Sequence, residues 1–176
     1  MRSLPDLLRP GLDVVFVGIN PGEQSARAAH YYAHPGNGFW PALTSSPLVD
    51  RPLTPEDDRT LPLTHGIGFT DVVKRVVTDS TRVTAQELRD AAPAFNSRIA
   101  YASPRAVCFT STRAFDLLFP KVRAANGWGR QPVTIQGAQA WVMPSTSGRA
   151  IRHRHHVHRV LGELAAALGR DRTAAA

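Results

Sequence analysis

The chain has 176 residues, a formal net charge of +7 and a single cysteine. Its 43% hydrophobic and 20% charged residues are typical of a globular protein and exclude a disordered chain. One cysteine, Cys108, excludes a disulfide framework and a multi-cysteine metal site. The length predicts one domain over residues 1–169, followed by a frayed tail over 170–176. The N-terminus has no long apolar stretch, so we expect no membrane span and a cytoplasmic location, nucleoid-associated if the chain is bacterial.

Arginine supplies almost all of the positive charge. Of the 21 basic residues only Lys74 and Lys121 are lysines, and the sequence pI is near 10.7. This balance suggests a polyanionic partner such as nucleic acid, although a GC-rich genome also enriches arginine. The basic residues and histidines gather late in the chain, at Arg149, Arg152, Arg154, Arg159, His153, His155, His156 and His158.

The first third of the chain predicts a buried strand followed by a long loop. Residues 12–18 contain an unbroken run of three valines and a phenylalanine, which is typical of a central strand covered on both faces. The next sequence, Gly-Ile-Asn-Pro-Gly at 18–22, predicts a turn, and residues 23–38 are expected to stay irregular. A short helix is expected to begin at Phe39.

Helix starts and further strands follow. The sequence Thr-Pro-Glu-Asp at 54–57 and the capping box at 84–87 each predict the start of a helix, and Pro93 is expected to kink or shorten the second one. The remaining predicted elements are a strand over 106–110, a helix over 111–119, two strands over 133–135 and 140–143 joined by a Gln-Gly turn, and a C-terminal helix with an apolar stripe of Val157, Leu161, Leu164 and Leu168.

Strands that alternate with helices predict a single-domain, three-layer α/β/α fold with a short, largely parallel central sheet. In such sheets, ligands bind beyond the carboxyl ends of the strands. The loops over 18–38 and 144–152 leave predicted strands at that edge, so they are the candidate binding loops. Cys108 lies inside an apolar strand and is interpreted as a small buried hydrophobic residue.

Asn20 is the most distinctive polar residue of the first loop, because two glycines and a proline surround it. Its amide both donates and accepts hydrogen bonds, so it would be able to hold a water and direct a lone pair at a substrate. The alternative is that Asn20 only closes its own turn. The motif is neither a phosphate loop nor a dinucleotide fingerprint, because no Gly-Lys-Ser/Thr follows and the glycine spacing differs.

Two other segments carry candidate functional groups. Residues 30–40 are rich in aromatics and would offer a stacking face to a flipped nucleobase, or else form a hydrophobic cluster under the loop. Residues 143–149 combine small hydroxyl groups with an arginine, a pattern that suits phosphate contacts or an ordinary solvated turn. The four histidines between 153 and 158 lack a further ligand, so the sequence favours a basic helix start over a metal site.

Four motifs occur in one order along the chain: Gly-Ile-Asn-Pro-Gly at 18–22, His-Pro-Gly-Asn-Gly-Phe-Trp at 34–40, Gly-Ile-Gly-Phe-Thr at 66–70 and Met-Pro-Ser-Thr-Ser-Gly-Arg at 143–149. Together they resemble the mismatch-specific uracil/thymine-DNA glycosylases, over about residues 12–168. The resemblance implies a compact α/β fold of the uracil-DNA glycosylase superfamily. It also implies excision of uracil opposite guanine, with thymine and ethenocytosine as further candidate bases.

The same resemblance implies roles for individual residues. Asn20 would position the hydrolytic water, and Tyr32 would stack on the extruded base. The remaining base-binding residues would be Gly18, Ile19, Ser25 and Asn37, and the DNA wedge and backbone contacts would be Ser145, Ser147, Gly148 and Arg149. Asp71 stands where other members carry Asn or Lys; we expect it to act as a catalytic base beside Asn20, the alternative being a solvated acid paired with Lys74 or Arg75.

The function expected from these features is a monofunctional DNA glycosylase that flips the base and serves base excision repair. No lysine lies in the motifs, so no Schiff base and no lyase step are expected. The hydrolysis is also expected to need no metal and no cofactor. The expected partner is double-stranded DNA with a G:U or G:T mismatch, and the protein is expected to be a monomer. The alternatives are a non-catalytic DNA-damage-binding module with the same fold and an enzyme acting on free nucleotides, which the arginine-bearing loop disfavours.

Overall fold

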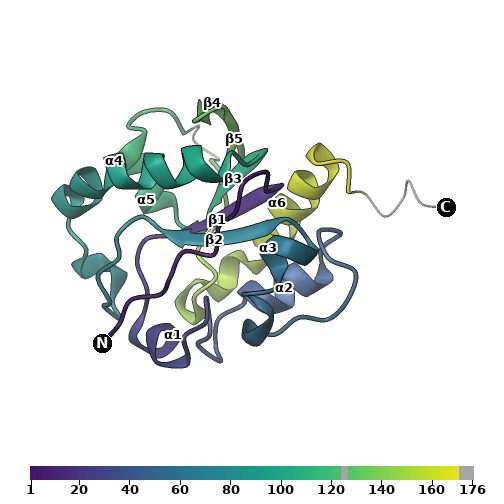
Figure 1. The fold of residues 1–176 in the computed structure, drawn as a ribbon, viewed down its shortest axis with the longest axis horizontal. Coiled ribbons are helices and arrows are strands. Elements are labelled where there is room, and N and C mark those ends of the chain that lie inside the picture. The colour runs from purple at the N-terminus through teal and green to yellow at the C-terminus, as the bar shows by residue number, and fades with distance from the viewer. Residues whose placement is uncertain (124–126, 171–176) are drawn as a thin grey trace.

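A five-stranded sheet forms the centre of the computed structural model, which describes residues 1–123 and 127–170 (Figure 1). Its strands stand in the order β2-β1-β3-β5-β4; β4 runs antiparallel to β5, and the other neighbouring pairs are parallel. The strands are β1 (Val14–Gly18), β2 (Ile67–Asp71), β3 (Ala106–Phe109), β4 (Gly129–Ile135) and β5 (Ala138–Val142). The helices are α1 (Glu23–Ala28), α2 (Phe39–Ser45), α3 (Leu61–Thr64), α4 (Ala85–Ala102), α5 (Thr112–Leu118) and α6 (Arg154–Ala167), with the 3-10 turns η1 (Pro55–Asp57), η2 (Ser80–Arg82) and η3 (Gly148–His153).

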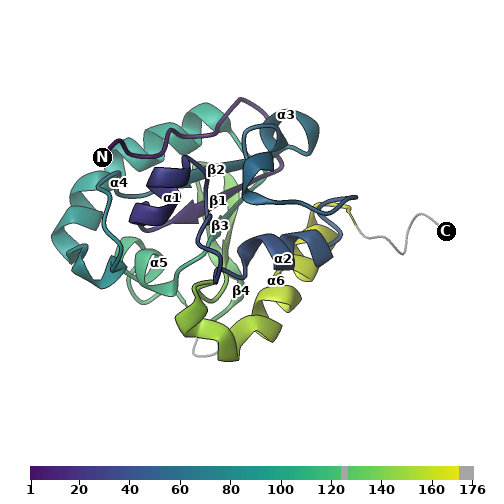
Figure 2. The ribbon, with the colours of Figure 1, turned by 90° about the horizontal axis from the view of Figure 1, so that it is seen from below.

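The sheet separates two apolar cores, so the predicted three-layer α/β/α arrangement is confirmed (Figure 2). Successive side chains of a strand point to opposite faces. Phe16 of β1 therefore packs in the core that contains residues of α2 and α6, whereas Val15 and Val17 pack in the core that contains residues of α4 and α5. All five residues of β1 are buried, as the unbroken apolar run predicts.

The predicted capping box at the start of α4 is confirmed. Glu87 N donates to Thr84 Oγ1 at 3.1 Å, and Thr84 N donates to Glu87 Oε2 at 2.8 Å. The helix then continues through Pro93 to Ala102, so the expected shortening is wrong. Buried side chains before and after the proline, Leu88 and Phe95, pack into the same core and hold the helix together across it.

Two elements differ from the expectation. The sequence pattern does not predict β2 as a strand, since Gly68 interrupts its apolar run. The N-terminal segment crosses it so closely, with mutual backbone bonds between Leu7 and Phe69 of 2.9 and 3.1 Å, that a Cβ on Gly68 would lie 2.8 Å from Leu7 O. Residues 23–28, expected to be irregular, form α1, an exposed helix with a Glu23–Arg27 ion pair at 3.7 Å.

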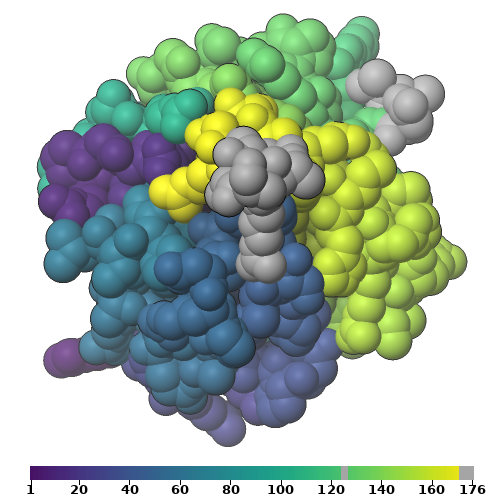
Figure 3. Space-filling model, turned by 90° about the vertical axis from the view of Figure 1, so that its right-hand side faces the viewer, coloured from purple at the N-terminus to yellow at the C-terminus, as the bar shows by residue number. Residues whose placement is uncertain are grey.

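Smaller differences concern element lengths and the chain end. β4 begins at Gly129, earlier than predicted, and tolerates Pro132 because it is an edge strand. Arg170, expected in a frayed tail, is ordered: its guanidinium donates to Leu48 O at 3.0 Å and pairs with Asp13. The rest of the predicted tail, 171–176, lies outside the described residues. Figure 3 faces this side of the molecule, where the end of α6 lies beside the segment that follows α2.

None of the helices within residues 1–123 and 127–170 has both the length and the apolar character needed to cross a membrane. Cys108 of β3 is fully buried, as predicted, and burial raises the pKa of its thiol far above the usual value.

Candidate active site

The carboxyl ends of β1, β2 and β3 meet at one edge of the sheet. In the register of the sheet, Gly18 at the end of β1 pairs with Asp71 at the end of β2, and Thr110, directly after β3, donates its backbone N–H to Val17 O at 2.9 Å. The connection from β1 leads to β2 on one side of the sheet, and the connection from β3 leads to β4 at the opposite edge, so the two diverge between β1 and β3. In α/β sheets such a switch point opens the crevice where ligands bind.

Asn20 lies just beyond the end of β1, and backbone carbonyls fix the orientation of its amide. Its Nδ2 donates to Pro21 O at 2.9 Å and to Val77 O at 2.7 Å. Because both partners only accept, the NH₂ group must face them, and Oδ1 must point away. Oδ1 is buried and has no partner among the described residues. Asn20 thus closes its own turn through nitrogen and leaves its oxygen as an unused acceptor; its role toward a water stays a prediction.

Asp71 is a buried carboxylate at the same edge, with a relative exposure of 3%. A Cβ on Gly18 would stand 2.4 Å from Asp71 Oδ1, so only glycine leaves room for this carboxylate. Among the described residues none donates a hydrogen bond to its buried Oδ2. Burial is the main reason why the pKa of Asp71 rises from 3.8 to about 7.

The alternative view of Asp71, a solvated acid paired with a neighbouring base, does not fit this geometry. Lys74 Nζ instead contacts Asp6 Oδ1 at 2.8 Å, and Arg75 Nε contacts Glu87 Oε1 at 2.7 Å. A buried carboxyl group with a pKa near neutrality and a free oxygen is the kind of group that serves as a general base.

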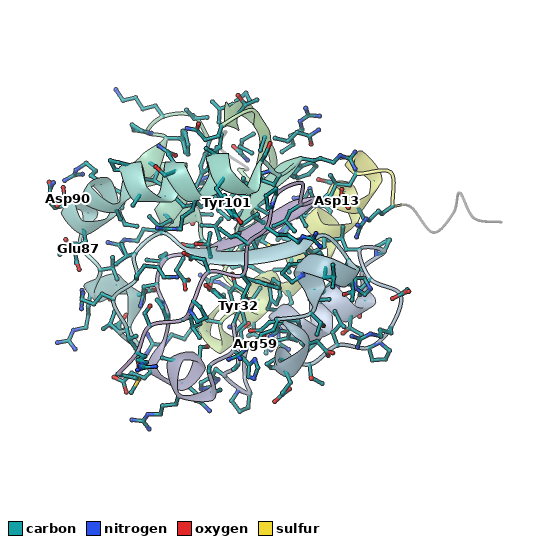
Figure 4. All side chains as sticks on the ribbon, in the orientation of Figure 1. Asp13, Tyr32, Arg59, Glu87, Asp90 and Tyr101 are labelled. Carbon is teal, nitrogen blue, oxygen red and sulfur yellow. The ribbon has the colours of Figure 1, made fainter. Side chains whose placement is uncertain are left out.

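Tyr32 lies below the sheet in the view of Figure 4, in the turn between α1 and α2. Its backbone is left-handed, with φ of 53°, and its ring stacks on Phe39 with centroids 4.2 Å apart. Its hydroxyl lies 3.1 Å from Thr110 Oγ1. The turn is anchored by the buried Asp58, which accepts from Tyr31 N at 2.8 Å. A strained backbone held by so many contacts is typical of a functional site.

Two of the predicted base-binding residues shape the loop through backbone contacts. Ser25 Oγ accepts from Ala33 N at 3.1 Å, which fixes the turn that carries Tyr32. Asn37 Oδ1 accepts from Phe39 N at 2.9 Å and so forms an Asx turn that leads into α2. These contacts give both residues a structural role.

The two candidate binding loops lie side by side. Gly38 N donates to Thr146 O at 2.8 Å, and a Cβ on Gly148 would lie 3.3 Å from Gly36 O. The segment that contains the predicted wedge therefore borders the loop that carries Tyr32. Its hydroxyl-bearing residues, Ser145 and Ser147, bond to each other at 3.2 Å and are exposed.

Arg149 is exposed at the end of this loop. Hydrogen bonds from Thr81 are the main reason why the pKa of the Asp79 carboxyl group is lowered, and the charge of Arg149 adds to the effect. Two residues later, Ile151 is 59% exposed, which is unusual for a large apolar side chain beside so many charges. Sequence reasoning overlooked Ile151 because its neighbours read as a solvated basic segment.

The histidine segment packs partly on an aromatic ring. The His153 and His156 rings lie 5.0 and 4.6 Å from the ring of Trp128, while His155 and His158 are exposed. Burial lowers the pKa of His156 below its ordinary value, and the neighbouring His155 and Arg159 add to this shift. Within the described part of the chain, no group of three or more His, Cys, Asp or Glu residues is arranged to hold a metal ion.

A profile of the uracil DNA glycosylase superfamily matches residues 5–168 of this chain. The chain belongs to that superfamily. Its fold is similar to the solution NMR structure of a candidate uracil DNA glycosylase from Methanosarcina acetivorans, with a TM-score of 0.62 and 22% identity over 93% of this chain and 97% of that one. Superfamily membership implies uracil DNA glycosylase activity, the hydrolysis of an N-glycosyl bond in DNA.

Proposed function

We propose that this protein is a monofunctional, mismatch-specific DNA glycosylase that hydrolyses the N-glycosidic bond of uracil opposite guanine, after the nucleotide has flipped out of the duplex. Thymine and ethenocytosine opposite guanine are further candidate substrates. The observation that carries the proposal is a pair of buried oxygens, Asn20 Oδ1 and Asp71 Oδ2, at the carboxyl edge of neighbouring strands; neither has a hydrogen-bond partner within residues 1–123 and 127–170. The product would be an abasic site for base excision repair.

In this mechanism Asn20 and Asp71 orient the attacking water. A water that donates one hydrogen to Asn20 Oδ1 and the other to the Asp71 carboxylate turns its lone pairs away from the protein, toward the sugar carbon. As the glycosidic bond breaks, the sugar becomes positively charged, which the ionised Asp71 favours electrostatically. Asp71 then accepts the proton that the water loses on attack. The backbone N–H groups of Ile19 and Asn20 would stabilise the leaving base anion.

Base flipping provides the selectivity for mismatches. Extruding a nucleotide costs a few kcal/mol, and less for a G:U or G:T wobble pair than for a sound pair. Tyr32, backed by Phe39 at 4.2 Å, would stack on the extruded base. Ser145, Ser147, Gly148 and Arg149 would contact the backbone and fill the space left in the duplex.

The same geometry argues against a lyase step. Lys74 Nζ is engaged by Asp6 Oδ1 at 2.8 Å, and the four motifs contain no lysine that would form a Schiff base. We therefore expect hydrolysis alone, by a monomer that needs no cofactor.

Single-turnover excision from duplexes that contain G:U, G:T or A:U pairs, and from single-stranded uracil DNA, tests the proposal. We expect G:U to react fastest and the abasic product to remain uncleaved until heated in alkali. Asn20→Ala should slow excision by about 100-fold or more, because the water loses its positioning group, while duplex binding persists. Asn96→Ala on α4, outside the site, is the matched control.

Two outcomes would replace this proposal with another. A wild-type protein that binds mismatched duplexes but excises no base at any pH would be a damage-binding module. Activity on free nucleosides and none on duplex DNA would indicate a nucleotide-metabolising enzyme. An Asn20→Ala variant with wild-type turnover would remove Asn20 from the mechanism.

A further inference from the structure

Four segments of the chain converge behind the Asp71 carboxylate, on the outer edge of β2. They are the N-terminal segment with Asp6, the end of β2 with Thr70, the following loop with Lys74, and the middle of α4 with Arg98. β2 is an edge strand, so no further strand pairs with its outer edge. On that edge the N-terminal segment makes backbone bonds only at Phe69, among the described residues, and side chains hold the strand beyond it, where Asp71 lies.

Arg98 supplies most of these contacts. Its Nη2 donates to Asp71 O at 2.8 Å and to Val72 O at 3.3 Å, and its Nε donates to Thr70 Oγ1 at 3.2 Å. The side chain is only 19% exposed, so these bonds are largely shielded from water. A guanidinium presents its donors in a rigid planar fork, which fixes the three groups relative to one another.

Asp6 completes the network from the other side. Its carboxylate accepts from Thr70 Oγ1 at 2.6 Å and Lys74 Nζ at 2.8 Å, and lies 3.5 Å from Arg98 Nε. The segment that carries Asp6 is itself fixed on β2 by the two backbone bonds between Leu7 and Phe69.

We propose that Arg98, with Asp6 as its partner, is a positioning residue for Asp71: it clamps the backbone at the end of β2 so that the Asp71 carboxylate stands over Gly18, and it places a fixed positive charge behind that carboxylate. The inference rests on the proposed function, in which Asp71 assists the attacking water. The proposal accounts for the charge of the Arg98 side chain. A neutral donor would also bond to the strand carbonyls, but it would place no positive charge behind the Asp71 carboxylate.

The charges that face Asp71 make the proposal testable by pH. Burial raises the pKa of Asp71 most; Lys74 and Arg98 lower it, and Asp6 raises it. The other titratable groups that face it, Tyr31 and Tyr32, have pKa values raised mainly by burial and stay neutral. If excision needs ionised Asp71, the excision rate rises as the pH increases through the pKa of this group. This rise is the acid limb of the pH profile. Loss of the Arg98 charge moves this acid limb to higher pH, and loss of the Asp6 charge moves it to lower pH.

The experiment measures single-turnover excision on a G:U duplex from about pH 5 to about pH 9 for Arg98→Gln, Arg98→Lys and Asp6→Asn. We expect Arg98→Gln to shift the acid limb upward by about half a pH unit or more, and Asp6→Asn to shift it downward. Arg98→Lys keeps the positive charge, so the acid limb of its rate profile should stay near that of wild type. It loses the planar guanidinium that holds the backbone, so its excision rate on the pH plateau should fall at least about fivefold. Arg89→Gln, on the exposed face of the same helix, is the matched control for both quantities.

A purely structural role lowers the folded fraction and leaves the acid limb in place. Two results would overturn the proposal. The acid limbs of the Arg98→Gln and Asp6→Asn rate profiles would coincide with that of wild type, or both would move in the same direction. If Arg98→Gln fails to fold, two measurements still test the proposal: the downward shift of the acid limb of Asp6→Asn and the unchanged position of the acid limb of Arg98→Lys. A wild type without any excision would refute the proposed function, whereas an Asp71-dependent limb that these variants leave unmoved would refute only the positioning role.

Discussion

Replacement of Asp71 by asparagine should slow excision and, at the same time, stabilise the fold at neutral and alkaline pH. The two side chains have nearly the same shape, and the change replaces the ionisable carboxylate by a neutral amide with one acceptor oxygen and one donor group. If Asp71 assists the water, the single-turnover rate should fall at least about tenfold, equivalent to about 1.4 kcal/mol of transition-state stabilisation. The wild-type rate should fall on acidification through a pKa of about 7, and the variant should lose this acid limb.

The stability effect follows from the burial of the carboxylate. The pKa of Asp71 is 3.8 in an unfolded chain and about 7 in the folded protein, so between these values the folded state binds more protons than the unfolded state. Wild-type stability therefore falls as pH rises across this interval. At about 1.4 kcal/mol for each pH unit, the ionised carboxylate costs about 4 kcal/mol above neutrality. Asparagine, which does not ionise, avoids this cost.

Urea unfolding of both proteins at several values from about pH 4 to about pH 9 measures the effect. The free energy of unfolding of Asp71→Asn relative to wild type should grow as pH rises and level off above about pH 7. Asp90→Asn, on the exposed surface of α4 (Figure 4), controls for the loss of one negative charge and should show no such trend. A stability difference that stays constant with pH would show that the Asp71 carboxylate is not buried in solution, and the argument for its raised pKa would fail.

Three further predictions concern the proposed contacts with DNA, including Arg149, and the end of β1. Affinity for a G:U duplex, measured by fluorescence anisotropy, should fall steeply with salt because arginines displace counterions; a flat plot of log K against log salt would remove nucleic acid as the partner. Arg149→Ala should reduce the preference for guanine opposite uracil, and equal small changes in the G:U and A:U rates would make Arg149 a surface charge only. Gly18→Ala should cut the excision rate at least about tenfold with binding retained, since its Cβ would lie 2.4 Å from Asp71 Oδ1; an unchanged rate would show that the position of this carboxylate is not critical.

The sequence predicts the parts of this fold that depend on local patterns. The apolar run before Gly18 predicts a central strand, the box at Thr84 predicts where α4 begins, and the carboxyl-end rule selects the loops that carry Asn20 and Arg149. Applied to the third strand, that rule would also have selected Thr110, whose hydroxyl lies 3.1 Å from that of Tyr32.

The features that escaped prediction are set by contacts between distant segments. β2 is a strand in spite of Gly68, because the absent side chain admits the N-terminal segment at Leu7. The burial of Asp71 depends on its register with Gly18, which a strand sequence does not encode by itself. The contact of Arg98 with the end of β2 joins residues 27 positions apart and has no local signature.

The unpartnered oxygens of Asn20 and Asp71 connect the stability of this protein with its proposed chemistry. A buried acceptor without a donor costs about 1–3 kcal/mol, so a core selected for stability alone would pair or remove both. Here the surrounding contacts hold them in place: backbone carbonyls fix the Asn20 nitrogen, and only a glycine at position 18 leaves room for the Asp71 carboxylate. In the proposed mechanism these two acceptors bind a water through its hydrogens and leave its lone pairs free. Under that proposal, the arrangement that destabilises the folded protein is the one that orients the nucleophile.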